Sequence, residues 1–245
     1  MDNTSYIALS KQTALVREMA MVANNIANVN TPAYKGEDSL FTQYLVKVQT
    51  EDRILTDSLA FTRDLGTMRN MDEGRFQSTG NTLDMAIHGK GYFVVETPDG
   101  PQYTRKGHFR LDQDGQLVTN EGRPVLTTDN QPLFFAPNEA KIDISRDGSV
   151  STENGPVGKL RLVQFDNEQD MKKVAHGLFK TDQLPQDVPK PDIQQGMLEG
   201  SNVEPVVEIT KMIAIHRSYD SVTKMIEEEN QRQRKAITAL TRITS

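Results

Sequence analysis

The chain has 245 residues, with 28 Lys or Arg against 34 Asp or Glu, so its formal net charge is −6 at pH 7. An acidic balance leaves no basic excess to replace the counterions of a phosphate backbone, and the sequence therefore predicts no nucleic-acid partner. Cysteine is absent, which excludes disulfides, thiolate zinc sites and cysteine nucleophiles. The apolar fraction of 36% is low for one globule of this length. We therefore expect an elongated shape or apolar faces that are buried only against partners.

The first residues carry no Sec signal. Neither a cationic segment nor an apolar core follows Met1. The longest apolar runs are about the size of Met19–Ala23, far below the roughly 20 residues that a membrane helix needs. The sequence predicts neither Sec export nor lipid insertion.

Both ends of the chain lack glycine and proline. All 16 glycines lie between Gly36 and Gly200, and all 11 prolines between Pro32 and Pro205. At average usage, the two ends together would hold roughly 8 such residues. Helices exclude both types, because proline lacks the N–H donor and glycine adds backbone entropy. We therefore expect helices over residues 1–31 and 206–245, within an N-terminal axial segment over 1–35 and a C-terminal one over 203–245.

The N-terminal helix has an apolar stripe with alternating steps of four and three residues. Its members are Leu15, Met19, Val22, Ile26 and Val29. This spacing keeps one seam facing a partner helix, as in a coiled coil. The helix is expected to stop before Pro32, because proline pushes the preceding residue out of the α region.

The C-terminal helix carries a similar stripe. Its members are Ile209, Met212, His216, Tyr219, Ile226, Ile237 and Leu240. A helix over this whole segment would be about 60 Å long, which a small globule cannot cover. Two arrangements stay open: an intramolecular hairpin of the end helices alone, or a two-helix unit whose remaining faces pack against other copies.

The centre alternates short apolar runs with Asp-Gly and Asn-Gly dipeptides, the strongest local signals for hairpins. We expect strands over residues 92–97, 102–105, 108–111, 116–119, 141–145, 149–152 and 157–165, and one short helix near 168–174. The fold class is α+β: an antiparallel all-β domain over residues 76–183, barrel-like or sandwich-like, is inserted between two axial helices. Connectors that are irregular or extended are expected over 36–75 and 184–202.

No segment predicts catalysis or a cofactor. Arg110–Glu121 matches a calcium loop at Asp112, Asp114, Gly115 and Glu121, but a cation occupies the first ligand position and strands flank the segment. We therefore expect a hairpin turn there. The four histidines have no partner at ligand spacing, and neither a nucleophile elbow nor a phosphate-binding glycine loop is present. The sequence predicts no enzyme, no metal ion and no cofactor.

The segment Ala23–Lys35 resembles the N-terminal signature of the bacterial flagellar rod and hook proteins. The positions that carry the likeness are Asn25, Asn28, Thr31, Pro32, Tyr34 and Lys35, while Ala33 replaces the usual glycine. Residues 79–93, 103–109 and 114–119 are similar to central motifs of this family, and residues 195–203 to the segment entering its C-terminal helix. The short centre and residues 198–205 are most similar to proximal-rod members, with distal-rod members as the alternative. A hook protein would need an extra outer domain.

The resemblance implies a structural subunit of a periplasmic rod that transmits torque. Its terminal helices would stack around a central channel with the β domain outside. The implied partners are copies of itself, other rod proteins and the flagellar type III export apparatus. We also expect the end helices to gain their order when neighbouring copies cover them. A rival hypothesis makes the centre a glycan- or calcium-binding module on an oligomeric helical stalk.

Overall fold

The computed structural model describes the backbone of residues 2–48, 57–136 and 141–243 and has an α+β fold. Helix α1 (Asp2–Ala27) and helix α2 (Pro205–Ile243) confirm the helices predicted at the two ends. Between them, every described strand pairing is antiparallel. The chain divides into two compact units. The helical unit comprises Met1–Ala27, Glu37–Asn70 and Glu204–Ser245, and the β unit comprises Asn28–Gly36 and Met71–Val203.

Helix α1 ends at Ala27, earlier than the expected stop directly before Pro32, and a turn follows it at residues 28–30. Helix α2 begins where local chemistry predicts. Pro205 occupies the first position of α2, where its fixed φ suits a helix and its missing N–H costs nothing. Within the described residues, neither helix combines the length and hydropathy that crossing a bilayer requires.

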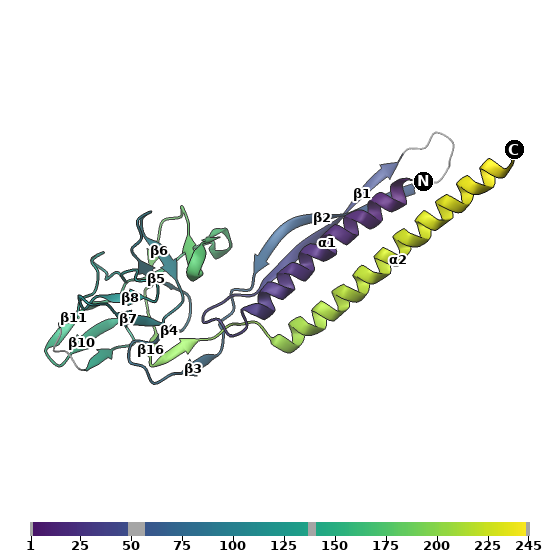
Figure 1. The fold of residues 1–245 in the computed structure, drawn as a ribbon. Coiled ribbons are helices and arrows are strands. Elements are labelled where there is room, and N and C mark those ends of the chain that lie inside the picture. The colour runs from purple at the N-terminus through teal and green to yellow at the C-terminus, as the bar shows by residue number, and fades with distance from the viewer. Residues whose placement is uncertain (1, 49–56, 137–140, 244–245) are drawn as a thin grey trace. The chain divides into compact units, whose positions relative to one another are not determined.

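The helical unit also contains a long β-hairpin. Strand β1 (Glu37–Val48) pairs with β2 (Asp57–Arg69), with Glu37 opposite Arg69, and both strands contact α1 (Figure 1). The sequence predicts an irregular or extended connector over 36–75 and does not include this pairing. The local reason is that the segment has no Asn-Gly or Asp-Gly dipeptide to mark a turn.

The β unit is built from short strands. Its largest sheet has six, in the order β13 (Lys172–Lys173), β14 (Leu178–Lys180), β6 (Gln102–Thr104), β5 (Tyr92–Val95), β12 (Leu162–Gln164) and β15 (Gln186–Asp187). A second sheet has the order β11 (Gly155–Lys159), β10 (Ser149–Thr152) and β9 (Ile142–Ile144). Three two-stranded sheets join β16 (Ile193–Gln195) to β4 (Met85–Ile87), β17 (Met197–Glu199) to β3 (Phe76–Ser78), and β7 (Phe109–Leu111) to β8 (Leu117–Thr119).

Two predictions for the β unit need correction. The single strand expected over 157–165 is divided into β11 and β12, because the first part pairs with β10 and the second with β5 and β15. In place of one helix near 168–174, the chain forms a 3₁₀ turn at Glu168–Asp170 and then β13. The other predicted strands lie within two residues of the observed ones.

The calcium-like segment forms the expected hairpin turn. Strands β7 and β8 flank it, and the Asp112 carboxylate accepts the backbone N–H groups of Asp114 and Gln116 at 3.0 and 2.8 Å. This is the usual way in which an aspartate side chain closes a turn.

Buried apolar side chains in the described part of the β unit form two clusters. The larger gathers residues from most of its strands, among them Met85, Phe93 and Phe109. The rings of Phe93 and Phe109 meet edge to face, with their centroids 5.1 Å apart. Position 107 requires glycine because its backbone lies against that of Met85, and a Cβ there would be 1.5 Å from the Met85 carbonyl oxygen. The smaller cluster contains Tyr92, Val163 and Phe179.

Candidate functional site

The two helices pack through an apolar seam within the helical unit. Ala8, Leu15 and Val22 of α1 and Ile215 and Val222 of α2 are buried in one cluster. Met19, Ile26, Met212, Tyr219 and Ile226 pack against it. The helices run antiparallel, because Gln12 donates to Thr223 at 3.2 Å near one end of the seam and Asn25 donates to Glu208 at 3.0 Å at the other.

The residues of the two predicted stripes, one on each helix, fall into three groups in the structure. Seven of them lie in the seam: Leu15, Met19, Val22, Ile26, Met212, Tyr219 and Ile226. Three members of α2 are exposed: Ile209, His216 and Ile237. Val29 lies beyond α1, in the turn that follows it, and the side chain of Leu240 is outside the described part of the chain.

The buried stripe of α2 shares only every second position, Met212, Tyr219 and Ile226, with the predicted stripe. The sequence selects residues 209 and 216 as partners of Met212, whereas the buried positions are Glu208, Ile215 and Val222. Both choices satisfy the spacing of three and four, so periodicity alone could not distinguish them. Ile215 was missed altogether. His216 lies on an exposed face and pairs with Asp220 one turn later, at 3.2 Å. Ile237 is exposed because α2, at 39 residues, is longer than α1, at 26.

A second stripe on α1 is exposed along its whole length. It repeats every three or four residues and consists of Tyr6, Leu9, Thr13, Val16, Ala20, Ala23 and Ala27. None of these side chains is charged, and Val16 is 50% exposed. Since one face of α1 packs on α2 and the hairpin β1–β2 also contacts this helix, the second stripe is a further face, which we call the free face.

A polar joint ties α1, β1 and α2 together in the helical unit. Asn25 is buried, and its amide exchanges two hydrogen bonds with the backbone of Glu37, at 2.9 and 3.0 Å. The same amide donates to the buried carboxylate of Glu208. Lys211 then donates to Glu208 at 2.8 Å and to Asp38 at 2.9 Å. The Asn25 amide therefore finds its hydrogen-bond partners within the helical unit.

A hydrogen bond and burial are the main causes of the two pKa shifts at this joint. The hydrogen bond to Glu208 is the main reason why the pKa of Lys211 lies above its ordinary value. Burial raises the pKa of Glu18 on α1, and the negative Asp38 adds to the effect while Lys211 opposes it. The joint therefore holds one cation among several carboxylates.

The segment Asn28–Gly36 belongs to the β unit and folds as a turn. Thr31 bonds back to Asn28, with its hydroxyl 3.1 Å from the amide oxygen. Pro32 lies after this turn and is half-buried, and Ala33 has a φ of 54°. Glycine adopts a left-handed conformation more easily than alanine. This is consistent with the glycine that is usual at this position in the family whose signature residues 23–35 resemble. Tyr34 is buried, with the Lys173 ammonium 4.3 Å from its ring centroid.

A buried ion cluster fixes this segment to the β unit. The carboxylate of Glu199 accepts from Lys35 at 2.7 Å, from Arg105 at 2.8 Å and from the backbone N–H of Gly74 at 3.1 Å. The side chains of these three charged residues are 6% exposed or less. Two cations thus share one anion away from water.

Backbone carbonyls solvate the remaining donors of the two cations. Lys35 also donates to the carbonyl of Asp72 at 2.6 Å. The guanidinium of Arg105 donates to three carbonyls, those of Ile87, Gly89 and Gly91, at 2.9 to 3.1 Å. Buried charges are tolerated when they are paired and hydrogen-bonded in this way. The cluster therefore links segments that lie far apart in the sequence.

Opposing effects set the pKa values in the cluster. Burial raises the pKa of the Glu199 carboxyl, but the charges of Arg105 and Lys35 and their hydrogen bonds outweigh it, so this pKa lies below its ordinary value of 4.5. Burial lowers the pKa of Lys35 although Glu199 acts in the other direction. At neutral pH, we expect Glu199 to be ionised.

Acid should therefore destabilise the β unit through Glu199. Because the folded pKa lies below the unfolded one, the stabilisation is complete above the unfolded pKa and is lost as the pH falls towards the folded value. Urea unfolding between pH 7 and pH 3 measures this loss. The control is Glu199→Gln, in which this titration is removed. Equal pH dependence in the two proteins would contradict the assignment.

Of the residues in the polar joint and the ion cluster, the sequence pattern indicated Asn25 and Lys35 but not Arg105, Glu199 and Glu208. Arg105 and Glu199 lie inside segments that resemble family motifs, and a glycine follows each of them within two residues. A charged residue beside glycines that allow close backbone approach is the signal that could have found them. Glu208 sits at a seam position of α2, where a charged side chain argues against burial.

Comparison with known proteins gives matches along most of the chain. Residues 6–35 match the family described as flagella basal body rod protein. Residues 86–152 match the D1 domain of the flagellar hook protein FlgE/F/G, and residues 194–239 match the C-terminal part of the flagellar basal body rod FlgEFG protein.

Individual relatives cover nearly the whole chain. The flagellar basal-body rod protein FlgF of Caulobacter vibrioides is 39% identical over 246 residues, which cover 99% of this chain and 100% of the relative. FlgF of Mesorhizobium japonicum is 29% identical, with 98% of each chain covered. The flagellar basal-body rod protein FlgG of Buchnera aphidicola subsp. Schizaphis graminum is 32% identical, with 87% of this chain and 90% of the relative covered.

Proposed function

Because the chain belongs to the family of flagellar basal-body rod proteins and is most like the members named FlgF, we propose that it builds the proximal part of the rod through its two terminal helices. It is a structural subunit of the basal body. The observation that carries the proposal is the uncharged free face of α1, which is exposed against all parts of the chain that the structure describes.

We propose that α1 and α2 pair as a short antiparallel coiled coil. The buried and half-buried seam positions of both helices alternate in steps of four and three residues. On α1 they are Ala8, Gln12, Leu15, Met19, Val22 and Ile26, and on α2 they are Glu208, Met212, Ile215, Tyr219, Val222 and Ile226. This repeat is typical of coiled-coil seams.

The free face is then available to neighbouring subunits. Leu9 is 53% and Val16 50% exposed, so burying the rest of either side chain against another helix would contribute roughly 1 kcal/mol. Alanines at the end of the stripe, Ala20 to Ala27, allow helices to approach closely. On α2, Val206, Ile209 and Ile213 are exposed and can extend the interface. Of the predicted interface residues, Ile209 and Ile237 keep this role in the proposal, whereas the seam residues act by holding the pair together.

Assembly through the terminal helices also fits the export of such a subunit and its incorporation into the rod. Isolated helices gain most of their stability from tertiary packing. We propose that the ends pass the type III export apparatus unfolded, pair through the seam after export, and are covered in the periplasm by neighbouring subunits around a central channel. Torque is then carried by many lateral helix contacts. In this proposal the chain has no catalytic role and binds no cofactor.

Val16→Asp tests the free face in cells that carry the variant as their only copy. We expect the protein to be exported but absent from isolated basal bodies, and swimming to be lost, because a carboxylate cannot be buried between helices without a partner. The helical circular dichroism signal of the purified chain should not change, since Val16 is half exposed.

The matched control is Val174→Asp, which alters an exposed valine of the β unit that is 38% exposed. It should enter the basal body at the normal level. Normal incorporation of Val16→Asp would show that the free face of α1 is not the assembly surface.

A further inference from the structure

The β unit displays one leucine almost fully to solvent. Leu184 is 88% exposed, more than any other large apolar side chain in the described part of the chain. Its neighbours are held in place. Gln183 exchanges hydrogen bonds with the backbone of Asn167 at 2.7 and 3.2 Å, and Pro185 restricts the backbone of Leu184 itself. The side chain therefore projects from an ordered loop.

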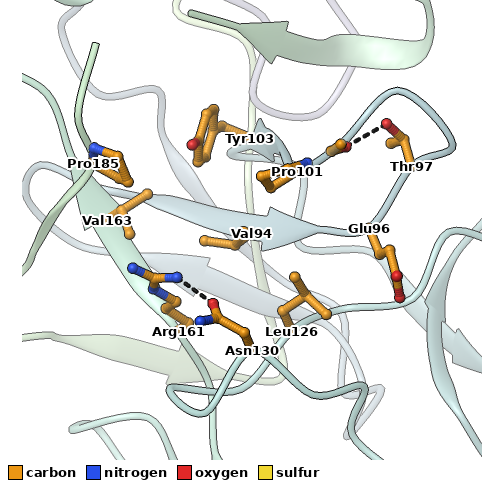
Figure 2. Close-up of a pocket in the computed structure, with 11 residues that line it drawn as sticks. Val94, Glu96, Thr97, Pro101, Tyr103, Leu126, Asn130, Arg161, Val163 and Pro185 are labelled. Carbon is orange, nitrogen blue, oxygen red and sulfur yellow. Dashed lines mark hydrogen bonds between the residues drawn. The ribbon is translucent and has the colours of Figure 1, made fainter. Parts of the chain in front are cut away.

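An apolar pocket opens beside this loop (Figure 2). Its volume is about 350 Å³. Val94, Leu126 and Val163 come from the buried core and form its apolar lining. Tyr103, Pro101 and Pro185 also line it. Because Pro185 directly follows Leu184, the exposed leucine and the pocket lie on the same surface of the β unit.

Two polar side chains that line the pocket, Arg161 and Thr97, have partners within the chain. Arg161 donates to Asp187 at 3.3 Å and also to Asn130. Thr97 donates to the carbonyl of Gly100 at 2.6 Å. A charged ligand would compete with these bonds, whereas an aliphatic side chain only needs the apolar lining. The chemistry of the pocket therefore favours an apolar side chain carried on an ordered backbone.

We propose that Leu184 of one copy enters this pocket on a neighbouring copy in the rod. The inference rests on the proposed function, because it requires copies to be held side by side. The surface area buried when one leucine enters one pocket is far smaller than the roughly 1,200 Å² that stable protein interfaces bury. The contact therefore forms only where the helices already bring two chains together and raise their effective concentration. Its effect is to fix how neighbouring β units are oriented.

Disulfide trapping tests this contact, since the chain has no cysteine of its own. Two variants, Leu184→Cys and Pro101→Cys, are co-expressed in one strain without the normal chain. Basal bodies are isolated after mild oxidation. We expect a mixed disulfide between the two variants, because the two sulfur atoms can bond only where the backbones come close. Its yield should be at least tenfold above that of the control pair Phe134→Cys and Pro101→Cys, in which the cysteine replaces an exposed phenylalanine elsewhere on the β unit.

The same samples distinguish the two proposals. If both chains of each pair are present in the basal bodies and the Leu184 and Phe134 pairs give equal disulfide yields, the pocket contact is overturned. The proposed helical assembly is then left intact. Failure of all three single-cysteine chains to enter basal bodies would contradict the proposed function, and the pocket contact with it.

Discussion

Glu199→Gln is expected to lower the free energy of unfolding of the β unit by about 3–5 kcal/mol. The substitution keeps the size of the side chain but removes the negative charge that Lys35 and Arg105 share. Two buried cations are then left without an anion, and the new NH₂ group must face one of the donors that now point at the carboxylate. Breaking a buried pair by removing one partner is costly for this reason.

Hydrogen exchange of the full chain across a urea series measures the effect, since peptides from β4 and β5 report on the β unit separately from the helices. The control is Glu73→Gln, because Glu73 lies 3.9 Å from Arg105 but its side chain is 30% exposed. We expect the control to lose less than about 1 kcal/mol. Equal losses for the two variants would mean that the buried cluster does not stabilise the β unit.

Val22→Asp is expected to separate the two helices. Val22 is 5% exposed and packs in the seam with Ile215 and Val222. Placing a carboxylate there buries a charge without a partner, and we expect the helix pair to lose roughly 3–5 kcal/mol. The helical circular dichroism signal should fall, because single helices are marginally stable without packing. The near-ultraviolet signal of the β unit should persist.

Val16→Asp is the matched control for this measurement. It places the same charge on the same helix, six residues earlier, but on the free face. The two variants are expected to fail in different ways: Val22→Asp loses helix content in the purified chain, whereas Val16→Asp keeps it and fails only in assembly. Equal helix content in both variants would mean that the seam does not hold α1 against α2.

The helices were predictable because their signal is local. A long segment without glycine or proline, bounded by Pro32 or Pro205, is enough to place a helix. The seam was predictable only in part. Met212, Tyr219 and Ile226 fit two overlapping stripes, and the buried one passes through Glu208, a charged residue that pattern analysis disfavours. Its burial depends on Asn25, which reaches it from another helix.

The ion cluster and the hairpin β1–β2 depend on contacts that no local pattern contains. Lys35 and Glu199 are 164 residues apart, and Arg105 and Glu199 are 94 apart. Each charge taken alone is typical of a solvated surface, and only the fold brings them together. The hairpin lacks the turn dipeptides that mark strand pairing elsewhere in the chain, so its extended segments gave no sign of their partners.

The central claim is that other subunits cover the free face of α1 in the rod. The most direct test is the thiol reactivity of Val16→Cys, the only cysteine in such a chain, compared between the dilute purified protein and isolated basal bodies. Val22→Cys serves as a reference that the seam protects in both states. We expect the thiol at position 16 to react readily in the purified protein and to be protected in basal bodies. Equal, rapid reaction in both states would contradict the account.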